Sequence, residues 1–207
     1  MESAFSVHLK MGLTHIADLG AYDHILFIVA LCAIYRISEW KRVAILVTAF
    51  TIGHSVTLAL AAMNIITFPQ QTVETLIPIT IIITCLYNIF SKSNKPISSK
   101  ITPGKVAYLT RQLFVNYFFA FFFGLIHGMG FSTFFKATAD VDENFLWLLF
   151  SFNVGLEVGQ LIIVAIILVV AYVVMDILMV KQRIWNIAVS SIVGLMALGL
   201  LCGILGC

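Results

Sequence analysis

Long apolar runs almost free of charge recur along this chain and constrain its fold more than any other feature. A helix that crosses the hydrocarbon core of a bilayer needs ~20 mostly apolar residues, and ~17–25 are tolerated. Six segments meet this requirement, at about residues 20–37, 43–63, 72–90, 112–132, 145–179 and 184–206. The sequence therefore predicts an all-α polytopic membrane bundle of six transmembrane helices.

The composition excludes the main soluble classes of protein. Apolar residues make up 61% of the 207 residues and charged residues 11%, against ~45–50% and ~25% in ordinary soluble domains. Such a chain lacks the polar surface of a soluble enzyme, a disordered chain or a nucleic-acid binder. The four cysteines show no CxxC spacing and are interpreted as small core residues.

We expect residues 1–207 to form a single bundle domain. A polar linker at about 91–111, which contains Pro96, Pro103 and Gly104, divides it into two three-helix halves. Residues 1–19 are mixed polar and apolar, and no basic segment precedes the first apolar stretch, so no cleavable signal peptide is expected. They are predicted to form a short helix or hairpin at the surface or tucked into the bundle; if they span, the count becomes seven.

The Lys and Arg residues predict the orientation. Of the 12, ten lie in the loops after the first, third and fifth spans, and only Lys10 and Lys136 lie on the opposite side. By the positive-inside rule the basic loops are cytoplasmic. The N-terminus and the C-terminus are then both outside.

Ionisable side chains inside apolar spans are costly and are therefore candidates for function. Helical rise of ~1.5 Å per residue places all of those found here in the outer half of the bundle or near its midplane. Polar stripes in apolar helices must face the bundle interior, because lipid cannot satisfy them. The set comprises His15 before the first span, Asp23 and His24 at its start, His54, Glu74, His127, and the i, i+4, i+7 stripe of Asn153, Glu157 and Gln160.

Imidazoles and carboxylates that converge in a dry pocket suit a divalent transition metal. The predicted ligands are Asp23, His24, His54 and His127. Ligating imidazoles usually pass their other N–H to a carboxylate, carbonyl or amide. Additional ligands, or groups that orient the ligands, are predicted to be His15, Glu74, Asn153, Glu157 and Gln160.

Each of these residues also has a structural interpretation. Asp23 is a favoured helix N-cap residue, and Glu74 is suited to the first turn of a helix. The Asn153 stripe can join helices by hydrogen bonds. His8 is expected to be a solvated loop residue. Three Gly-xxx-Gly spacings, Gly124/Gly128, Gly155/Gly159 and Gly199/Gly203, predict close contacts between helices.

Several segments together resemble the HupE/UreJ family of small bacterial membrane proteins, over about residues 10–207. The resemblance implies uptake of nickel or cobalt for hydrogenase and urease, a path formed by Asp23, His24, His54 and His127, and a place in the bacterial inner membrane. The segments are Gly20-Ala-Tyr-Asp23-His24-Ile-Leu-Phe27, Thr48-Ala-Phe-Thr51-Ile-Gly-His54-Ser-Val-Thr57-Leu, Val73-Glu74, Phe123-Gly-Leu-Ile-His127-Gly-Met-Gly-Phe131 and Phe152-Asn-Val-Gly-Leu-Glu157-Val-Gly-Gln160.

Two functions of different classes fit these observations. The favoured one is transport of a divalent metal ion from outside to inside, although the inner parts of the second, fifth and sixth spans are almost wholly apolar. The alternative is an intramembrane zinc-type hydrolase that acts on a lipid or a membrane peptide, with Glu157 or Asp23 as its base. Metal storage or delivery is a third, minor hypothesis. The metal is nickel, cobalt or zinc, and the bilayer is the other expected partner.

Overall fold

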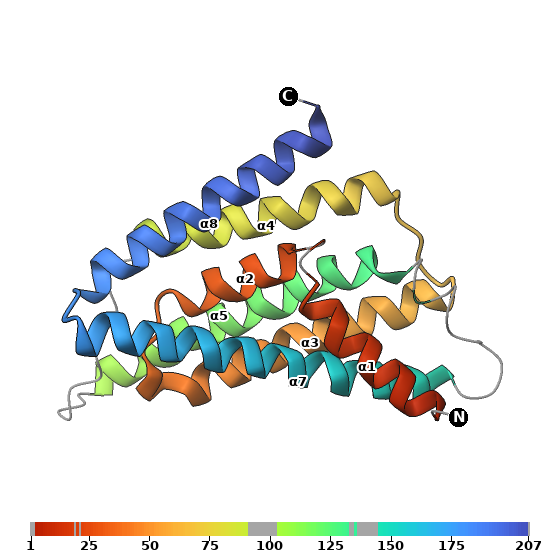
Figure 1. Ribbon diagram of the computed structural model, residues 1–207, viewed down its shortest axis with the longest axis horizontal. Helices are drawn as coiled ribbons and strands as arrows, with labels where there is room; N and C mark the ends of the chain where they lie inside the picture. Colours follow the sequence, from red (N-terminus) through yellow and green to blue (C-terminus); the bar gives the residue numbers. More distant parts are fainter. Residues whose placement is uncertain are drawn as a thin grey trace.

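The computed structural model describes residues 3–18, 20, 22–90, 103–132, 135 and 145–206, with 103–113 and 115 as helix backbone only. Within this part of the chain every regular element is a helix (Figure 1). The elements are α1 (Ala4–Ile16), α2 (Asp23–Cys32), the 3₁₀ turn η1 (Ile37–Glu39), α3 (Trp40–Ala62), α4 (Gln70–Phe90), α5 (Pro103–Gly130), α7 (Phe145–Tyr172), its π-helical continuation η2 (Val173–Ile177) and α8 (Gln182–Leu205).

Four described helical segments are long and apolar enough to cross a membrane. They are Ile37–Ala62, Gln70–Phe90, Phe145–Ile177 and Gln182–Leu205. An all-helical membrane protein is thereby supported, while the count of six spans and the location of the termini stay predictions. Three of these segments lie within two residues of the predicted bounds, and the first begins at Ile37, six residues before the predicted start at 43.

The first predicted span, 20–37, is wrong in length. The helix in this region, α2, has ten residues and extends about 15 Å, half of the ~30 Å hydrocarbon core. The preceding segment forms α1, a short helix packed into the bundle as expected. The last turn of α1 and the first turn of α2 meet within the bundle (Figure 1).

Side-chain hydrogen bonds explain why the chain can break at these places. The Gly20 N–H donates to Asp18 Oδ1 at 2.8 Å in the connection between the two short helices. After α2, Asn88 Nδ2 donates to the Ala30 carbonyl at 2.7 Å, and Gln182 Nε2 donates to the Ile34 carbonyl at 2.8 Å. Backbone groups outside regular helices are tolerated in a membrane protein when the protein itself satisfies them in this way.

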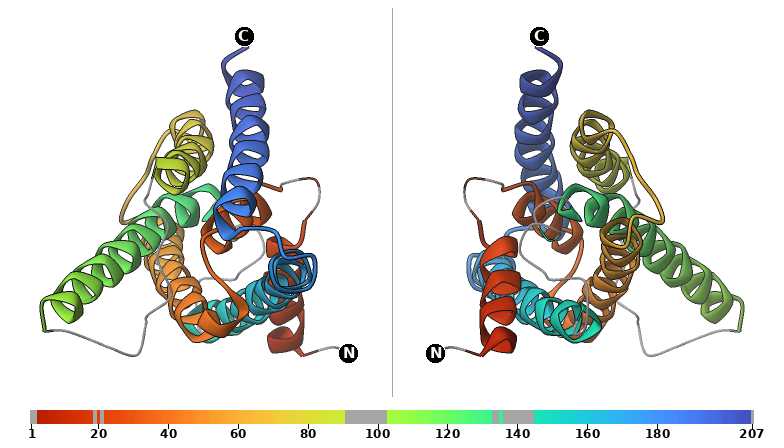
Figure 2. Two further views of the ribbon diagram at one scale, coloured as in Figure 1. Left: turned by 90° about the vertical axis from the view of Figure 1, so that its left-hand side faces the viewer. Right: turned by 90° about the vertical axis from the view of Figure 1, so that its right-hand side faces the viewer.

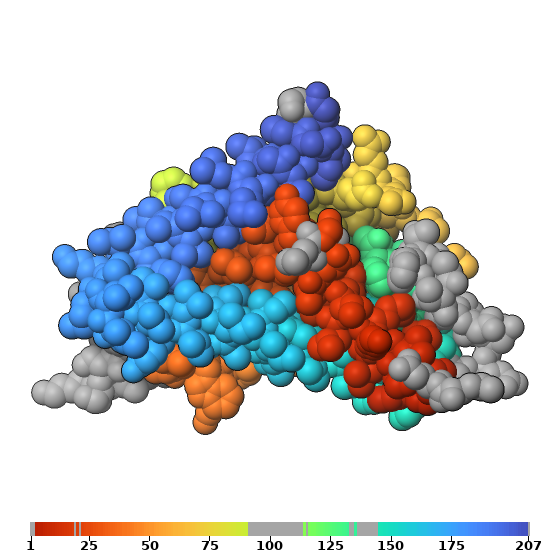
Figure 3. Space-filling view, viewed as in Figure 1, coloured from red at the N-terminus to blue at the C-terminus, as the bar shows by residue number. Residues whose placement is uncertain are grey.

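Glycines allow α1 to lie directly against α7 (Figure 3). A Cβ on Gly12 would clash with the Phe152 carbonyl oxygen, and one on Gly155 would clash with the Leu9 carbonyl oxygen. The predicted close contact at Gly155/Gly159 is confirmed, since Gly159 lies in the same way against Ile16. This packing fixes the end of α1 that carries His15.

The same device joins α3 to α5, which cross each other in the end views of Figure 2. A Cβ on Gly124 would meet the Phe50 carbonyl oxygen, and one on Gly128 would meet that of His54, so the second predicted contact is confirmed. The third predicted contact, at Gly199/Gly203, is wrong for the described part of the chain. A Cβ on either glycine has no described neighbour within 4 Å.

Two of the basic loops meet at one end of the bundle. Arg36 forms an ion pair with Asp176 at 3.2 Å, and Arg183 donates to the Ile89 carbonyl at 2.5 Å. The loops after α2 and α7 and the end of α4 therefore lie together. We call this the basic end, defined by the described residues Arg36, Lys41, Arg42, Lys181 and Arg183.

The predicted linker at 91–111 is shorter than expected, because α5 already begins at Pro103. Its remaining part, 91–102, lies outside the described residues. The division of the chain into two three-helix halves stays a prediction.

Candidate metal centre

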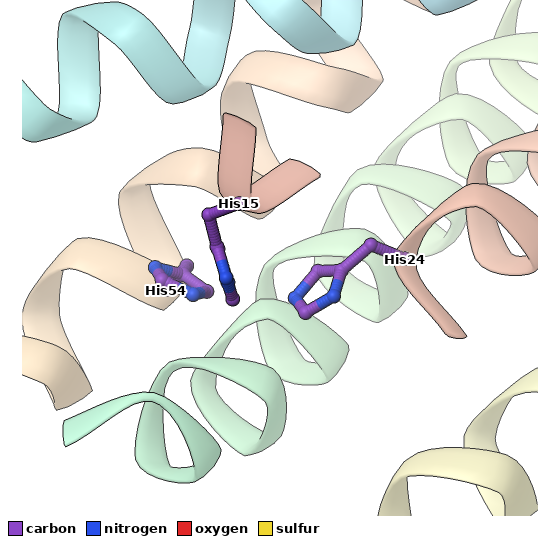
Figure 4. A group of neighbouring side chains, drawn as sticks. All are labelled: His15, His24 and His54. Carbon is purple, nitrogen blue, oxygen red and sulfur yellow. The ribbon is translucent and has the colours of Figure 1, made fainter. Parts of the chain in front are cut away.

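Four imidazoles from four helices converge in the bundle. His15 ends α1, His24 lies in the first turn of α2, His54 is on α3 and His127 is near the end of α5. Figure 4 shows the His15, His24 and His54 side chains pointing toward one another. The ring centres of His15 and His24 are 4.7 Å apart, and those of His24 and His127 are 5.2 Å apart.

The potential ligand atoms form two overlapping groups that share His24. One group is His15, His24 and His54, and the other is Asp23, His24 and His127. In each, one nitrogen or oxygen atom per residue lies within 4.8 Å of the others. Ligands at ~2.0–2.2 Å from a tetrahedral metal ion are about 3.5 Å apart. Small side-chain movements would therefore close either group around an ion.

Asp23 orients His24. The Asp23 Oδ1 atom lies 3.2 Å from His24 Nδ1, and a carboxylate can only accept, so Nδ1 carries the hydrogen. The lone pair is then on Nε2, which is buried and has no partner. A carboxylate that holds an imidazole in this way is common around metal ions.

Thr80 on α4 orients His127 in the same manner. Its hydroxyl donates to the Ile77 carbonyl at 2.7 Å, and its oxygen lies 3.2 Å from His127 Nε2. Since its one hydrogen is used on Ile77, Thr80 accepts the hydrogen of Nε2. The His127 Nδ1 atom is left with a lone pair and, in the structure, without a partner.

Three further ring nitrogens have no hydrogen-bond partner among the described residues. They are His15 Nε2 and both nitrogens of His54, which is 0% exposed. Burying an unpaired polar atom costs roughly 1–3 kcal/mol. Unpartnered nitrogens on four neighbouring rings fit a divalent transition metal, which imidazole lone pairs bind well.

An open cavity of about 820 Å³ reaches this cluster. Its wall includes Gly130 at the end of α5 and Glu74 near the start of α4, so it lies toward the end of the bundle opposite the basic end. His54 is correspondingly about 12 Å from the end of α3 and about 21 Å from its start. The wall carries three carboxylates, Asp18, Asp23 and Glu74, together with His15, His24 and His127.

Two structural interpretations of the acidic residues are wrong. Tyr22, not Asp23, is the N-cap of α2, and Glu74 lies beyond the first turn of α4. Glu74 accepts a hydrogen bond from Gln70 Nε2 at 2.7 Å and lines the cavity without joining either ligand group. Asp23 and Glu74 are therefore both cavity-lining residues.

The predicted polar stripe on α7 lies outside both ligand groups. Thr51 Oγ1 lies 2.5 Å from Glu157 Oε2 and 2.6 Å from Gln160 Oε1, one turn of α3 away from His54. Asn153 Oδ1 is buried without a partner. Glu157 and Gln160 thus join α7 to α3, as the interhelical interpretation expected, and Glu157 belongs to neither ligand group.

His8 is not a solvated loop residue. It lies on α1, is 6% exposed, and its Nδ1 atom contacts the Ala4 carbonyl at 2.9 Å. It faces Phe135 with the ring centres 6.1 Å apart and belongs to neither ligand group.

Thr80 and Asp18 are the residues at this site that the sequence did not indicate. Thr80 lies in a β-branched run whose hydroxyls ordinarily bond to the preceding turn of their own helix. Asp18 lies in the short connection between α1 and α2, and acidic residues are common in such connections. Neither carries a sequence signal that distinguishes it from its neighbours.

A model of the family described as HupE / UreJ protein matches residues 1–203 of this chain. The match covers nearly the whole chain, including every residue of the cluster. No match to a curated protein or to a solved structure was found.

Proposed function

Because this chain belongs to the HupE/UreJ family, we propose that it transports a divalent transition-metal ion of the nickel or cobalt type. The ion is the substrate. It binds His24, His54 and His127, with His15 as a further ligand and Asp23 as either a ligand or the group that orients His24.

The observation that carries this proposal is the cluster of unpartnered imidazole nitrogens reached by an acidic open cavity, whose wall includes His15, His24 and His127. A cluster sealed inside the bundle would suit a structural metal. Access through a cavity lined by Asp18, Asp23 and Glu74 suits an ion that arrives and leaves, since the carboxylates raise the local concentration of cations.

The sidedness follows from the basic end. If the Lys and Arg residues there face the cytoplasm, the cavity opens outward and the metal cluster lies in the outer half of the bundle. The membrane is then the bacterial inner membrane, and the direction of transport is inward.

The alternative of an intramembrane hydrolase finds no support in the geometry. Such an enzyme needs a free carboxylate beside an open position on the metal. Asp23 is engaged with His24, and Glu157 is hydrogen-bonded to threonines outside the ligand groups.

The first test is metal content of the purified protein, measured by mass spectrometry after loading with Ni²⁺, Co²⁺ or Zn²⁺, beside uptake into proteoliposomes. We expect stoichiometric metal in the wild type. His54→Ala should lose the metal and reduce uptake by more than about tenfold, because a vacated ligand position costs at least as much as a lost supporting group.

His8→Ala is the matched control, since it removes a buried imidazole of α1 outside the cluster. It should keep both metal and uptake. Retention of metal by His54→Ala, or equal losses in the two variants, would contradict the proposed site.

A further inference from the structure

A second polar cluster lies between α3 and α7. Thr48 Oγ1 donates to Glu157 Oε1 at 2.6 Å, and Thr51 Oγ1 donates to Glu157 Oε2 at 2.5 Å. Gln160 Oε1 lies 2.6 Å from the same Thr51 Oγ1, whose one hydrogen can serve only one of these two acceptor oxygens at a time. Thr51 is 7% exposed and Gln160 is 1% exposed, so they form the buried wall, while Thr48 closes the cluster on the exposed side.

The charge of Glu157 has no oppositely charged partner among the described residues. It is the one carboxylate on α3 and α7, both of which are described throughout. None of the ion pairs in the described part of the chain involves it. The Nε2 atom of buried Gln160 also has no partner. A carboxylate at this depth that is held by hydroxyls alone is costly unless it serves a cation or a proton.

The cluster lies on the way from the imidazoles to the basic end. Thr51 precedes His54 by one turn of α3, about 5 Å, and Thr48 precedes it by about 9 Å. On α3 the basic end begins at Arg42, about 9 Å beyond Thr48. The cavity reaches the imidazoles from the opposite side and does not include any residue of the second cluster.

The donor atoms differ between the two clusters in a way that suits onward movement. First-row transition metals bind imidazole nitrogens well, while carboxylate, hydroxyl and amide oxygens are harder donors that hold them less strongly. Conduction requires sites that are favourable enough to fill and weak enough to empty. A negatively charged oxygen site one turn further inward meets both conditions.

We propose that Thr48, Thr51, Glu157 and Gln160 form an inner cation-binding station, which receives the metal ion from the imidazoles and passes it toward the basic end. This inference rests on the proposed transport function. Glu157 supplies the charge, and the two hydroxyls and the Gln160 amide oxygen supply neutral ligands once the ion displaces their present hydrogen bonds. This station places one polar binding site within the otherwise apolar inner parts of α3 and α7.

The test separates metal binding from metal movement in Glu157→Gln, which keeps the shape of the side chain and removes its charge. Binding of Ni²⁺ or Co²⁺ in detergent, measured by titration calorimetry, should stay within about threefold of the wild type, because the imidazoles are untouched. Uptake into proteoliposomes should fall by at least about tenfold. Glu157→Asp, which keeps the charge, should recover part of that uptake.

Asp176→Asn is the matched control, a carboxylate-to-amide change at the basic end of the same continuous helix. It should change neither metal binding in detergent nor uptake into proteoliposomes. Unchanged uptake in Glu157→Gln would overturn the station and leave the cluster a structural link. Loss of binding in that variant would instead assign Glu157 to the imidazole site. A wild type that binds metal and carries none would overturn the transport function itself, and the station with it.

Discussion

At the scale of single residues, two hydrogen bonds decide which nitrogens the cluster offers. Asp23 takes the Nδ1 hydrogen of His24, and Thr80 takes the Nε2 hydrogen of His127. The opposite nitrogen of each ring is then a lone-pair donor at a buried position. A carboxylate and a hydroxyl on different helices thus prepare two rings for the same kind of bond.

Replacing Thr80 tests this preparation. Thr80→Val keeps the shape of the side chain and removes the acceptor for His127 Nε2–H, so the ring loses its fixed tautomer. Supporting groups of this kind are worth about 10–100-fold in metal affinity. We expect Ni²⁺ affinity to fall by at least about tenfold in titration calorimetry.

Thr84 offers the control on the same helix. Its hydroxyl donates to the Thr80 carbonyl at 2.9 Å and serves only the helix. Thr84→Val should leave the affinity unchanged. A loss of affinity as large as that of Thr80→Val would mean that any β-branched change on α4 disturbs the site.

Residue by residue, the sequence indicates ligands better than the groups that hold them. His24, His54 and His127 are ionisable side chains inside apolar helices. Because burying them there costs free energy, the sequence alone indicates that they are functional. Thr80 costs little in a helix, because its hydroxyl can bond to its own backbone. Only the fold reveals that its oxygen faces an imidazole.

At the scale of elements, close approach of backbones positions the ligands. Gly124 and Gly128 bring α5 against the α3 backbone next to His54, and Gly12 and Gly155 bring α1 against α7. The long helices were predictable because each is a long apolar run between polar connections. The end of α2 after ten residues was not, since the hydrogen bonds that satisfy the carbonyls there come from Asn88 and Gln182, far away in the chain.

A methyl group at Gly124 tests this packing. Gly124→Ala would place a Cβ against the Phe50 carbonyl oxygen and the His54 backbone nitrogen, so the two helices must separate. Overpacking of this kind costs about 1–3 kcal/mol. Thermal unfolding in detergent should show a clearly lower Tm, and metal affinity should fall as His54 moves.

Gly199→Ala makes the same chemical change on α8, where a Cβ meets no atom within 4 Å. It should leave stability unchanged or raise it by up to about 1 kcal/mol, because Ala favours a helix interior more than Gly does. A comparable loss of Tm in both variants would mean that helix-interior glycine itself, and not the α3–α5 contact, carries the effect.

At the scale of the whole molecule, charge is distributed along one direction. Carboxylates line the cavity at one end, imidazoles follow, Glu157 lies one turn further, and Lys and Arg residues gather at the other end. Loop charges and helical rise predicted that the ionisable residues lie toward the end away from the basic loops, because both depend only on position along the chain. The cavity and the link between α3 and α7 depend on tertiary packing and could not be predicted in that way.

Neutralising a cavity carboxylate tests whether this order guides the substrate. Glu74→Gln keeps an oxygen for the Gln70 amide but removes one charge near the imidazoles. We expect KM for Ni²⁺ uptake to rise about two- to tenfold at low ionic strength with kcat unchanged, because the charge concentrates cations without binding them. The difference should shrink near 0.5 M salt, where the screening length is only a few ångströms.

Asp176→Asn, at the basic end, removes the same charge away from the cavity and should leave KM as it is. A rise in KM that persisted at high salt would instead make Glu74 a direct ligand, joined to the imidazoles once the ion is bound.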